Sequence, residues 1–259
     1  DGKIDLMVVG EWMTPHIFKN MGGIFQEVTS VSGLEKEFGW WNSINAGDFD
    51  NDGDIDYVLG NLGLNTRYKA TQELPIELYS RDIDENGSVD HIMTYYSEGK
   101  QYPLRVFNAM YNQMPYLNKK FPKYVDFALS DFPSMFPKNQ IDSAVYLKST
   151  NYKSCYVENL GNGKFSVHPL PLMAQAAPLF GTSIQDYDGD GNLDILSIGN
   201  FYGPDREAWR YDAGQGELLR GNGKGEFEFV PKSMSGFSDL KDARSLVTAA
   251  SAKNDGMYI

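Results

Sequence analysis

The chain has 259 residues, of which 41% are hydrophobic, and a formal net charge of -12. Nucleic-acid binding is disfavoured, because the sequence has no basic stripe that could displace phosphate counterions. The single cysteine, Cys155, excludes an intramolecular disulfide, and no apolar run reaches the roughly 18 residues that a membrane span needs. Abundant glycine, tyrosine and phenylalanine with many short apolar runs predict an all-β fold.

Acidic loops recur along the chain. Each full loop carries oxygen-bearing side chains at positions 1, 3, 5 and 9 and glycine at position 6, where the backbone must turn sharply. The three full copies are Asp48, Asp50, Asp52, Gly53 and Asp56; Asp82, Asp84, Asn86, Gly87 and Asp90; and Asp186, Asp188, Asp190, Gly191 and Asp194. Hard cations such as Ca²⁺ prefer six to eight oxygen ligands in tolerant geometry. The loops therefore predict about three structural calcium sites.

The loops do not fit an EF-hand, and an acidic turn without a bound ion is the alternative interpretation. An EF-hand needs a glutamate at position 12 of a helix-flanked loop, but position 12 here is Leu59, Met93 or Ser197, and the flanking sequences are strand-like. An acidic turn without an ion is disfavoured, because several unpaired carboxylates within one turn repel each other.

Partial copies of the loop stand at both ends of the chain. Residues 1–5 match positions 5 to 9, so Asp1 and Asp5 predict a fourth calcium site if the loop is completed upstream. Residues 251–259 fit the same frame but have Ser, Lys and Ile where carboxylates are expected, which predicts a loop without metal. We expect either a piece of a longer protein or two ends that together complete one repeat.

Strand-like runs flank every loop, and glycine-rich hairpins follow some of them. The runs after the loops are Ile4 to Val9, Ile55 to Leu59, Val89 to Tyr95 and Leu193 to Ile198. The hairpin signals are 159–165 and 221–227, with a shorter version at 20–25. A loop hairpin plus a glycine hairpin gives four strands per repeat, which is typical of a β-propeller blade.

The repeats are unequal in length. The second repeat lacks a glycine hairpin and is expected to be a shortened blade. The third repeat is expected to carry an insertion at approximately 102–152, where apolar residues show helical spacing interrupted by prolines. We expect two or three short helices there.

With these motifs, the sequence resembles the FG-GAP/VCBS repeat proteins, which are calcium-binding propeller repeats related to those of integrin α-subunits. The stretches 47–65, 158–171 and 185–203 also resemble bacterial cell-surface VCBS proteins associated with ASPIC/UnbV domains. The resemblance implies a seven-bladed propeller, whereas the repeats of residues 1–259 amount to about four blades or partial blades, so we expect a part of a larger ring. It also implies side-chain ligands at positions 1, 3, 5 and 9 and a backbone carbonyl ligand at position 7, here Asp54, Ser88 and Asn192.

The expected function is a non-catalytic, calcium-stabilised module for protein binding, adhesion or assembly, with another surface protein as partner. Extracellular calcium modules bind in the range of roughly 10⁻⁴ to 10⁻³ M, which would be filled outside a cell. We therefore expect an extracellular, outer-membrane-associated or periplasmic location. The alternative is a glycan-binding or polysaccharide-degrading propeller, since calcium-dependent lyases also use this fold, although His16, His91 and His168 are far apart in sequence.

Aromatic and amide residues recur just after the second strand of the blades. Packing between blades is the more common role for residues at such positions, and a ligand- or partner-binding face is the second hypothesis. The residues are Trp12, Asn61, Tyr95, Tyr96, Asn200, Phe201, Tyr202 and Trp209.

Overall fold

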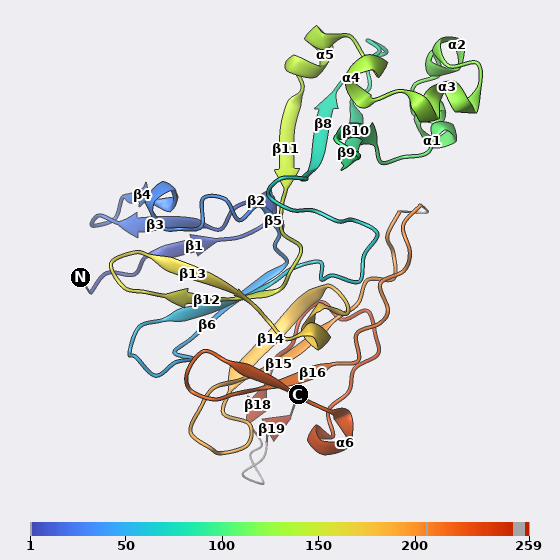
Figure 1. Ribbon diagram of the computed structural model, residues 1–259. Coiled ribbons are helices and arrows are strands. Elements are labelled where there is room, and N and C mark those ends of the chain that lie inside the picture. Colours follow the sequence, from blue (N-terminus) through green and yellow to red (C-terminus); the bar gives the residue numbers. More distant parts are fainter. Residues whose placement is uncertain (1, 206, 251–256, 259) are drawn as a thin grey trace. The chain divides into compact units, whose positions relative to one another are not determined.

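The computed structural model describes residues 2–205, 207–250 and 257–258. It divides into two compact units (Figure 1), of which the first comprises residues 1–67 and 151–259 and the second residues 68–150. With 34% strand and 15% helix, the expected mostly β structure is confirmed. No helix among the described residues is long and apolar enough to cross a membrane.

The first unit is built from antiparallel sheets. One sheet has the order β13-β12-β7-β6, another β14-β15-β16-β17, a third β1-β3-β4, and β2-β5 and β18-β19 form two-stranded ribbons. The strands are β1 (Leu6–Val8), β2 (Glu11–Met13), β3 (His16–Asn20), β4 (Phe25–Glu27), β5 (Gly39–Trp40), β6 (Ser43–Gly47), β7 (Asp56–Gly60), β12 (Cys155–Asn159), β13 (Phe165–Pro169), β14 (Leu179–Gln185), β15 (Asp194–Gly199), β16 (Glu217–Gly221), β17 (Phe227–Val230), β18 (Ala249–Ala250) and β19 (Met257–Tyr258). Short helical turns complete it: η1 (Thr29–Val31), η2 (Leu172–Gln175) and α6 (Lys232–Ser235).

The sheet around β7 and β12 is buried on both faces. Val58 and Tyr156 pack in one apolar cluster with Ile195 and Leu219 of the neighbouring sheet. Alternate residues of the same strands, Leu59 among them, pack in a second cluster with β3. Because side chains of a strand alternate between its faces, this double burial explains why β7 reads as a continuous apolar run.

The glycine-rich turns form hairpins as predicted. They connect β12 to β13, β16 to β17 and β3 to β4. In the first of them Asn162 has φ 54° and Gly163 has φ 71°, the left-handed region that asparagine and glycine tolerate best.

The assignment of the β12–β13 hairpin differs from the sequence expectation. The prediction placed it in the blade of the Asp82–Asp90 loop and made the preceding blade short. The structure instead pairs β12 with β7, so the Asp48–Asp56 loop belongs to a complete four-stranded sheet. The chain leaves this sheet after Gly60 and returns at Cys155. Sequence spacing could not reveal this, because strand pairing is not limited to neighbours along the chain.

The second unit contains one sheet of order β10-β9-β8-β11 and five short helices. Its strands are β8 (Ile76–Arg81), β9 (Asp90–Ser97), β10 (Lys100–Pro103) and β11 (Val145–Ser149). The helices are α1 (Phe107–Gln113), α2 (Leu117–Lys120), α3 (Tyr124–Leu129), α4 (Phe132–Met135) and α5 (Lys138–Asp142). Methionine and phenylalanine side chains of the helices form one cluster with Ile83 and Ile92, so the aromatic residues of this segment are mostly its own core.

The helices lie within the predicted 102–152 segment, but the compact unit is wider. It begins at Tyr68 and ends at Thr150, and it includes β8, β9 and the acidic loop between them. The sheet is completed by β10 and by β11, which pairs with β8 after the helices. The unit thus interrupts the chain between two paired strands, β7 and β12.

Candidate metal centres

Each full acidic loop joins two paired strands: β6 to β7, β8 to β9, and β14 to β15. Strands therefore flank all three loops, whereas helices flank the loop of an EF-hand. The position-6 glycines Gly53, Gly87 and Gly191 have φ between 90° and 94°. Only glycine adopts this conformation without strain, which is why this residue stands at the turn.

The turn brings carboxylates of positions 1, 3 and 9 together. In each group the candidate ligand atoms lie within 4.8 Å of one another. The groups are Asp48, Asp50 and Asp56; Asp82, Asp84 and Asp90; and Asp186, Asp188 and Asp194. Among the residues that the structure describes, these are the three clusters of acidic, histidine or cysteine ligands. The expected grouping of positions 1, 3 and 9 is thus present in all three loops.

Positions 5 and 7 behave differently from the other three. Asp52, Asn86 and Asp190 each accept a 2.8 Å hydrogen bond from the backbone amide of position 7. These side chains lie outside the groups of three carboxylates. Their role as ligands, and that of the position-7 carbonyls of Asp54, Ser88 and Asn192, stays a prediction.

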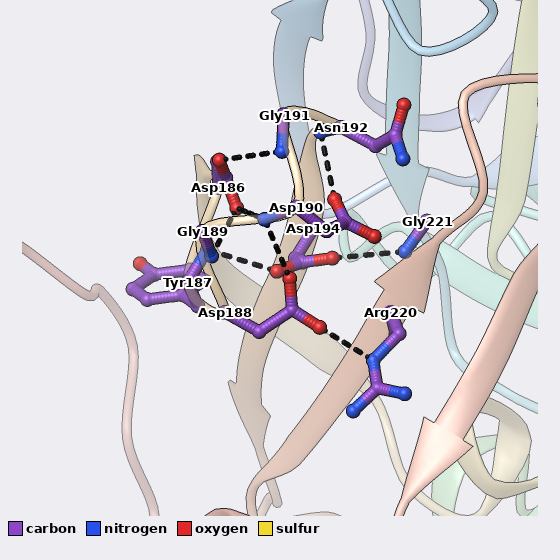
Figure 2. Close-up of polar contacts among 10 residues, drawn as sticks. All are labelled: Asp186, Tyr187, Asp188, Gly189, Asp190, Gly191, Asn192, Asp194, Arg220 and Gly221. Atoms are coloured by element: carbon purple, nitrogen blue, oxygen red, sulfur yellow. Dashed lines mark hydrogen bonds and ion pairs between the residues drawn. The ribbon is translucent and has the colours of Figure 1, made fainter.

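The position-1 carboxylate hydrogen-bonds across the turn to the backbone of position 6. Its Oδ2 accepts the amide of the position-6 glycine at 3.1 Å in Asp48, 2.8 Å in Asp82 and 2.9 Å in Asp186. Figure 2 shows this bond in the third loop, together with two further amide bonds to Asp186. The backbone therefore holds the carboxylate facing the loop centre.

The position-9 carboxylate is buried and links strands. Asp56 is 0% exposed. Its Oδ2 accepts the amide of Phe49 at 3.2 Å and the hydroxyl of Tyr156 at 2.8 Å, and its Oδ1 accepts the amide of Asn159 at 2.7 Å. Two of these donors come from β12 or its end, so Asp56 ties the loop to the strand that follows the second unit.

The other two loops repeat this design with different donors. Asp194 accepts the amides of Tyr187 and Gly221, both at 2.9 Å (Figure 2). Asp90 accepts the amide of Ile83 and the side-chain amide of Gln113, both at 3.0 Å. In each loop the position-2 amide is one donor, so the ninth residue organises the loop as well as facing its centre.

Two loop carboxylates, one in the first loop and one in the third, have raised pKa values. Burial raises the pKa of Asp50, opposed by a backbone hydrogen bond from Asp52 and reinforced by repulsion from Asp56, Asp52 and Asp48. Burial likewise raises the pKa of Asp194, with repulsion from Asp188 and Asp190 acting against its amide bonds. A bound cation would relieve both effects, because it would supply the missing opposite charge.

Two carboxylate oxygens provide a direct test of whether the residues fit a metal. Asp48 Oδ1 and Asp84 Oδ1 are buried and have no hydrogen-bond partner. A buried carboxylate oxygen without a partner is costly. Both residues belong to the acidic clusters, and a hard cation bound there would satisfy these oxygens, so the donor set fits Ca²⁺.

The partial loop at the start of the chain shares the strand-linking bonds. Asp5 Oδ1 accepts the amide of Asn20 at 2.8 Å, and the Asn20 side chain donates to the Ile4 carbonyl at 3.1 Å. Asn159 makes the same two bonds, to Asp56 and to the Ile55 carbonyl at 3.1 Å. The repeat relationship seen in the sequence is therefore also visible in hydrogen bonding.

That relationship agrees with the comparison to known protein families. Residues 1–59 match the family model of the FG-GAP-like repeat. The matched stretch includes the partial loop and the first full one. No curated protein matches the chain at the level required for a relative.

The FG-GAP-like stretch does not supply a complete fourth metal centre among the described residues. Asp5 is exposed and joins none of the three ligand clusters. Asp1, its expected companion, lies outside the described residues, as do residues 251–256 and 259 of the degenerate loop at the other end.

The residues expected to form a partner face occupy different environments. Asn61 and Asn200 are almost fully buried, and their amides bond backbone atoms: Asn61 reaches Asn151 at 3.0 Å, and Asn200 reaches Gly214 at 3.1 Å. These two amides hold loops together. Trp12 packs against Trp40 with ring centroids 5.0 Å apart.

The remaining face residues lie on one strand and one loop segment. Tyr95 and Tyr96 belong to β9 of the second unit, where the Tyr96 hydroxyl donates to Glu77. Phe201 stacks on Tyr211, the ring of Tyr202 lies 3.5 Å from the Arg210 guanidinium, and Trp209 is 75% exposed. The 201–211 segment thus brings three of the predicted residues together.

A polar centre in the second unit was not expected from the sequence. Glu77, 6% exposed, accepts hydrogen bonds from Tyr146 at 2.6 Å, Tyr79 at 3.1 Å, Tyr96 at 3.3 Å and the Gln101 side chain at 2.5 Å. Burial first, and then the nearby Glu77 carboxylate, raise the pKa of Tyr79 to about 12. The one sequence signal was an acidic residue inside the otherwise apolar start of β8.

Proposed function

We propose that the protein is a calcium-stabilised β-propeller module that binds another protein at the cell surface. The observation that carries the calcium part is the pair of buried, unpartnered oxygens of Asp48 and Asp84 inside clusters of carboxylates. FG-GAP-like repeats are typical of extracellular proteins, which supports the proposed location, where calcium is abundant.

The calcium role is structural. Each ion would neutralise the carboxylates of one loop, while the chain's own bonds fix the geometry: the position-6 amide orients position 1, and the position-9 carboxylate holds the adjoining strand. We propose that these blades belong to a seven-bladed ring.

The binding part rests on the 201–211 segment. Phe201 and Tyr211 exchange backbone hydrogen bonds of 2.7 and 2.9 Å, which close the segment at its base. Trp209 lies within it, 75% exposed. A large exposed indole on a loop whose base is fixed is typical of a protein-binding surface, because tryptophan is enriched among the residues that dominate binding energy.

Calcium is tested by elemental analysis and thermal melting of the full chain with calcium and with chelator. We expect bound calcium and a melting temperature lowered by several degrees on chelation. Asp48→Asn should reduce the calcium-dependent shift, whereas Asp126→Asn, which alters an exposed side chain of α3 outside the acidic loops, should not. Absence of metal together with an unchanged melt would overturn the calcium proposal.

Binding is tested with a surface-protein extract and a glycan array, each probed with wild-type protein and Trp209→Ala. Calcium-dependent capture of one defined protein that is lost in Trp209→Ala supports the proposal. Glycan binding without protein capture would instead support the glycan-binding alternative.

A further inference from the structure

Arg220 of β16 contacts a metal-ligand candidate directly. Its Nε donates to Asp188 Oδ2 at 2.7 Å, and both side chains are partly exposed (Figure 2). Asp188 is position 3 of the third loop, and its other oxygen accepts the Asp190 amide at 3.2 Å. The next residue, Gly221, bonds Asp194 of the same loop. The end of β16 therefore places two groups against the Asp186–Asp194 loop: the backbone amide of Gly221 and the guanidinium of Arg220.

The Asp48–Asp56 loop has an equivalent position that can be identified from strand register. Ile195, which follows the ninth residue of one loop, pairs with Leu219, and Tyr57, which follows the ninth residue of the other, pairs with Val157. One residue further on, Arg220 in β16 corresponds to Glu158 in β12.

The hydrogen bonds support this correspondence. The amide after Arg220, that of Gly221, bonds Asp194, and the amide after Glu158, that of Asn159, bonds Asp56. Glu158 itself faces His168, with Oε2 and Nε2 2.9 Å apart. At matching places beside two loops of one unit, the chain therefore carries opposite charges.

These charges have opposite effects on a bound dication. A guanidinium held on a ligand carboxylate lies within a Debye length of any ion that the carboxylate binds, so it repels the ion. The guanidinium also occupies an oxygen of the carboxylate that would bind the ion. A glutamate at the same place would attract the ion.

We infer that Arg220 lowers the calcium affinity of the Asp186–Asp194 loop, so that the Asp48–Asp56 loop fills first and the two loops respond to different calcium concentrations. This inference rests on the proposed calcium-binding function. It makes Arg220 an affinity-setting residue that need not touch the ion.

The test follows each loop separately in the 259-residue chain during a calcium titration. The amides of Gly53 and Gly191 bond the position-1 carboxylates of their own loops, so each NMR resonance reports mainly its own site. The two loops also contact each other, because the Asn51 side-chain amide donates to Asn192 Oδ1 at 3.1 Å, so the two titration curves are fitted together. We expect Gly53 to respond at lower calcium than Gly191. Arg220→Gln should raise the affinity reported by Gly191 about tenfold, since one nearby charge is removed, while Gly53 changes little.

Arg220→Lys keeps the positive charge, so the Asp186–Asp194 loop should keep its weak calcium affinity. This variant separates the effect of the charge from the effect of losing the packing of the arginine side chain. Lys138→Gln is the matched control: it removes one positive charge from an exposed pair with Asp142 in the second unit and should leave both resonances unchanged. Glu158→Gln should weaken the site reported by Gly53.

The failures are distinguishable. Calcium-insensitive Gly53 and Gly191 would overturn both the calcium proposal and this inference. Calcium binding with equal affinities in the wild type, or an Arg220→Gln variant with wild-type affinity, would overturn the inference alone.

Discussion

The backbone amide of Asn159 donates a 2.7 Å hydrogen bond to Asp56 across 103 positions of the sequence. The bond joins the last residue of β12 to the first residue of β7, and the second unit lies between them in the chain. Asp56 therefore has two structural roles: it belongs to the cluster of carboxylates in its loop, and it joins two strands that are separated in the chain by the second unit.

Asp56→Asn should destabilise the protein by about 1–3 kcal/mol even without calcium, because one buried oxygen is replaced by an amino group that faces a donor. Urea unfolding in chelator measures this cost free of metal effects. Asp54→Asn, in the same loop but exposed, should change stability by no more than about 0.5 kcal/mol. Equal losses in the two variants would contradict the assigned role of Asp56.

Gly60→Ala should destabilise the sheet by about 1–3 kcal/mol through overpacking. A Cβ at Gly60 would lie 2.2 Å from the carbonyl oxygen of Leu179, a backbone atom that cannot rotate away. At Gly203 the added Cβ would lie 3.7 Å from the Phe201 ring, an ordinary contact, so Gly203→Ala is the control. Thermal melts of the two variants should differ by several degrees, and similar melts would refute the close approach of β7 to Leu179.

Glu217→Gln should change the pH dependence of stability. Burial raises the pKa of Glu217, against hydrogen bonds from the Gln215 amide and Ser197. The folded protein thus holds this proton more tightly than the unfolded chain does. Its stabilising contribution is complete below the unfolded pKa and is lost as pH rises through the folded pKa.

The glutamine variant, which carries no titratable proton, should be more stable than wild type at pH 7 and should lose less stability between pH 4 and pH 7. Urea unfolding at several pH values measures both slopes. A parallel pair of curves would show that Glu217 does not contribute to the pH dependence.

Tyr146→Phe should destabilise the second unit by about 1 kcal/mol, because the variant removes a 2.6 Å hydrogen bond to the buried Glu77 carboxylate. Tyr95→Phe is the matched control: this ring packs against Tyr102 and takes no part in the Glu77 bonds. Hydrogen exchange of β8 and β11 amides would localise the effect. Indistinguishable exchange in the two variants would contradict the role of the Glu77 centre.

Local features of the fold could be predicted from the sequence because they depend on short-range chemistry. The carboxylates of positions 1, 3 and 9 and the glycine at position 6 lie within one turn, and their clustering followed from that spacing. The strands after the loops and the glycine hairpins were predictable for the same reason.

Features that depend on long-range pairing were not predictable in this way. The assignment of the β12–β13 hairpin was wrong because the sequence does not show that β12 pairs with β7 across an entire unit. The Glu77 centre gathers residues from four strands. Arg220 could not be linked to Asp188 without the register of β15 and β16.

The position of the second unit also affects how the protein reaches its native state. Pairing of β7 with β12 must close a chain segment that contains all of residues 68–150, and long-range closure of this kind is slow because its entropic cost precedes any gain from contacts. During synthesis β6 and β7 are made before β12. Until β12 has been made, the edge of β7 that pairs with it has no partner strand. Prompt folding of the intervening unit around its own core, which includes Met110, Met114 and Phe132, would shorten that interval and so limit mispairing of the open β7 edge.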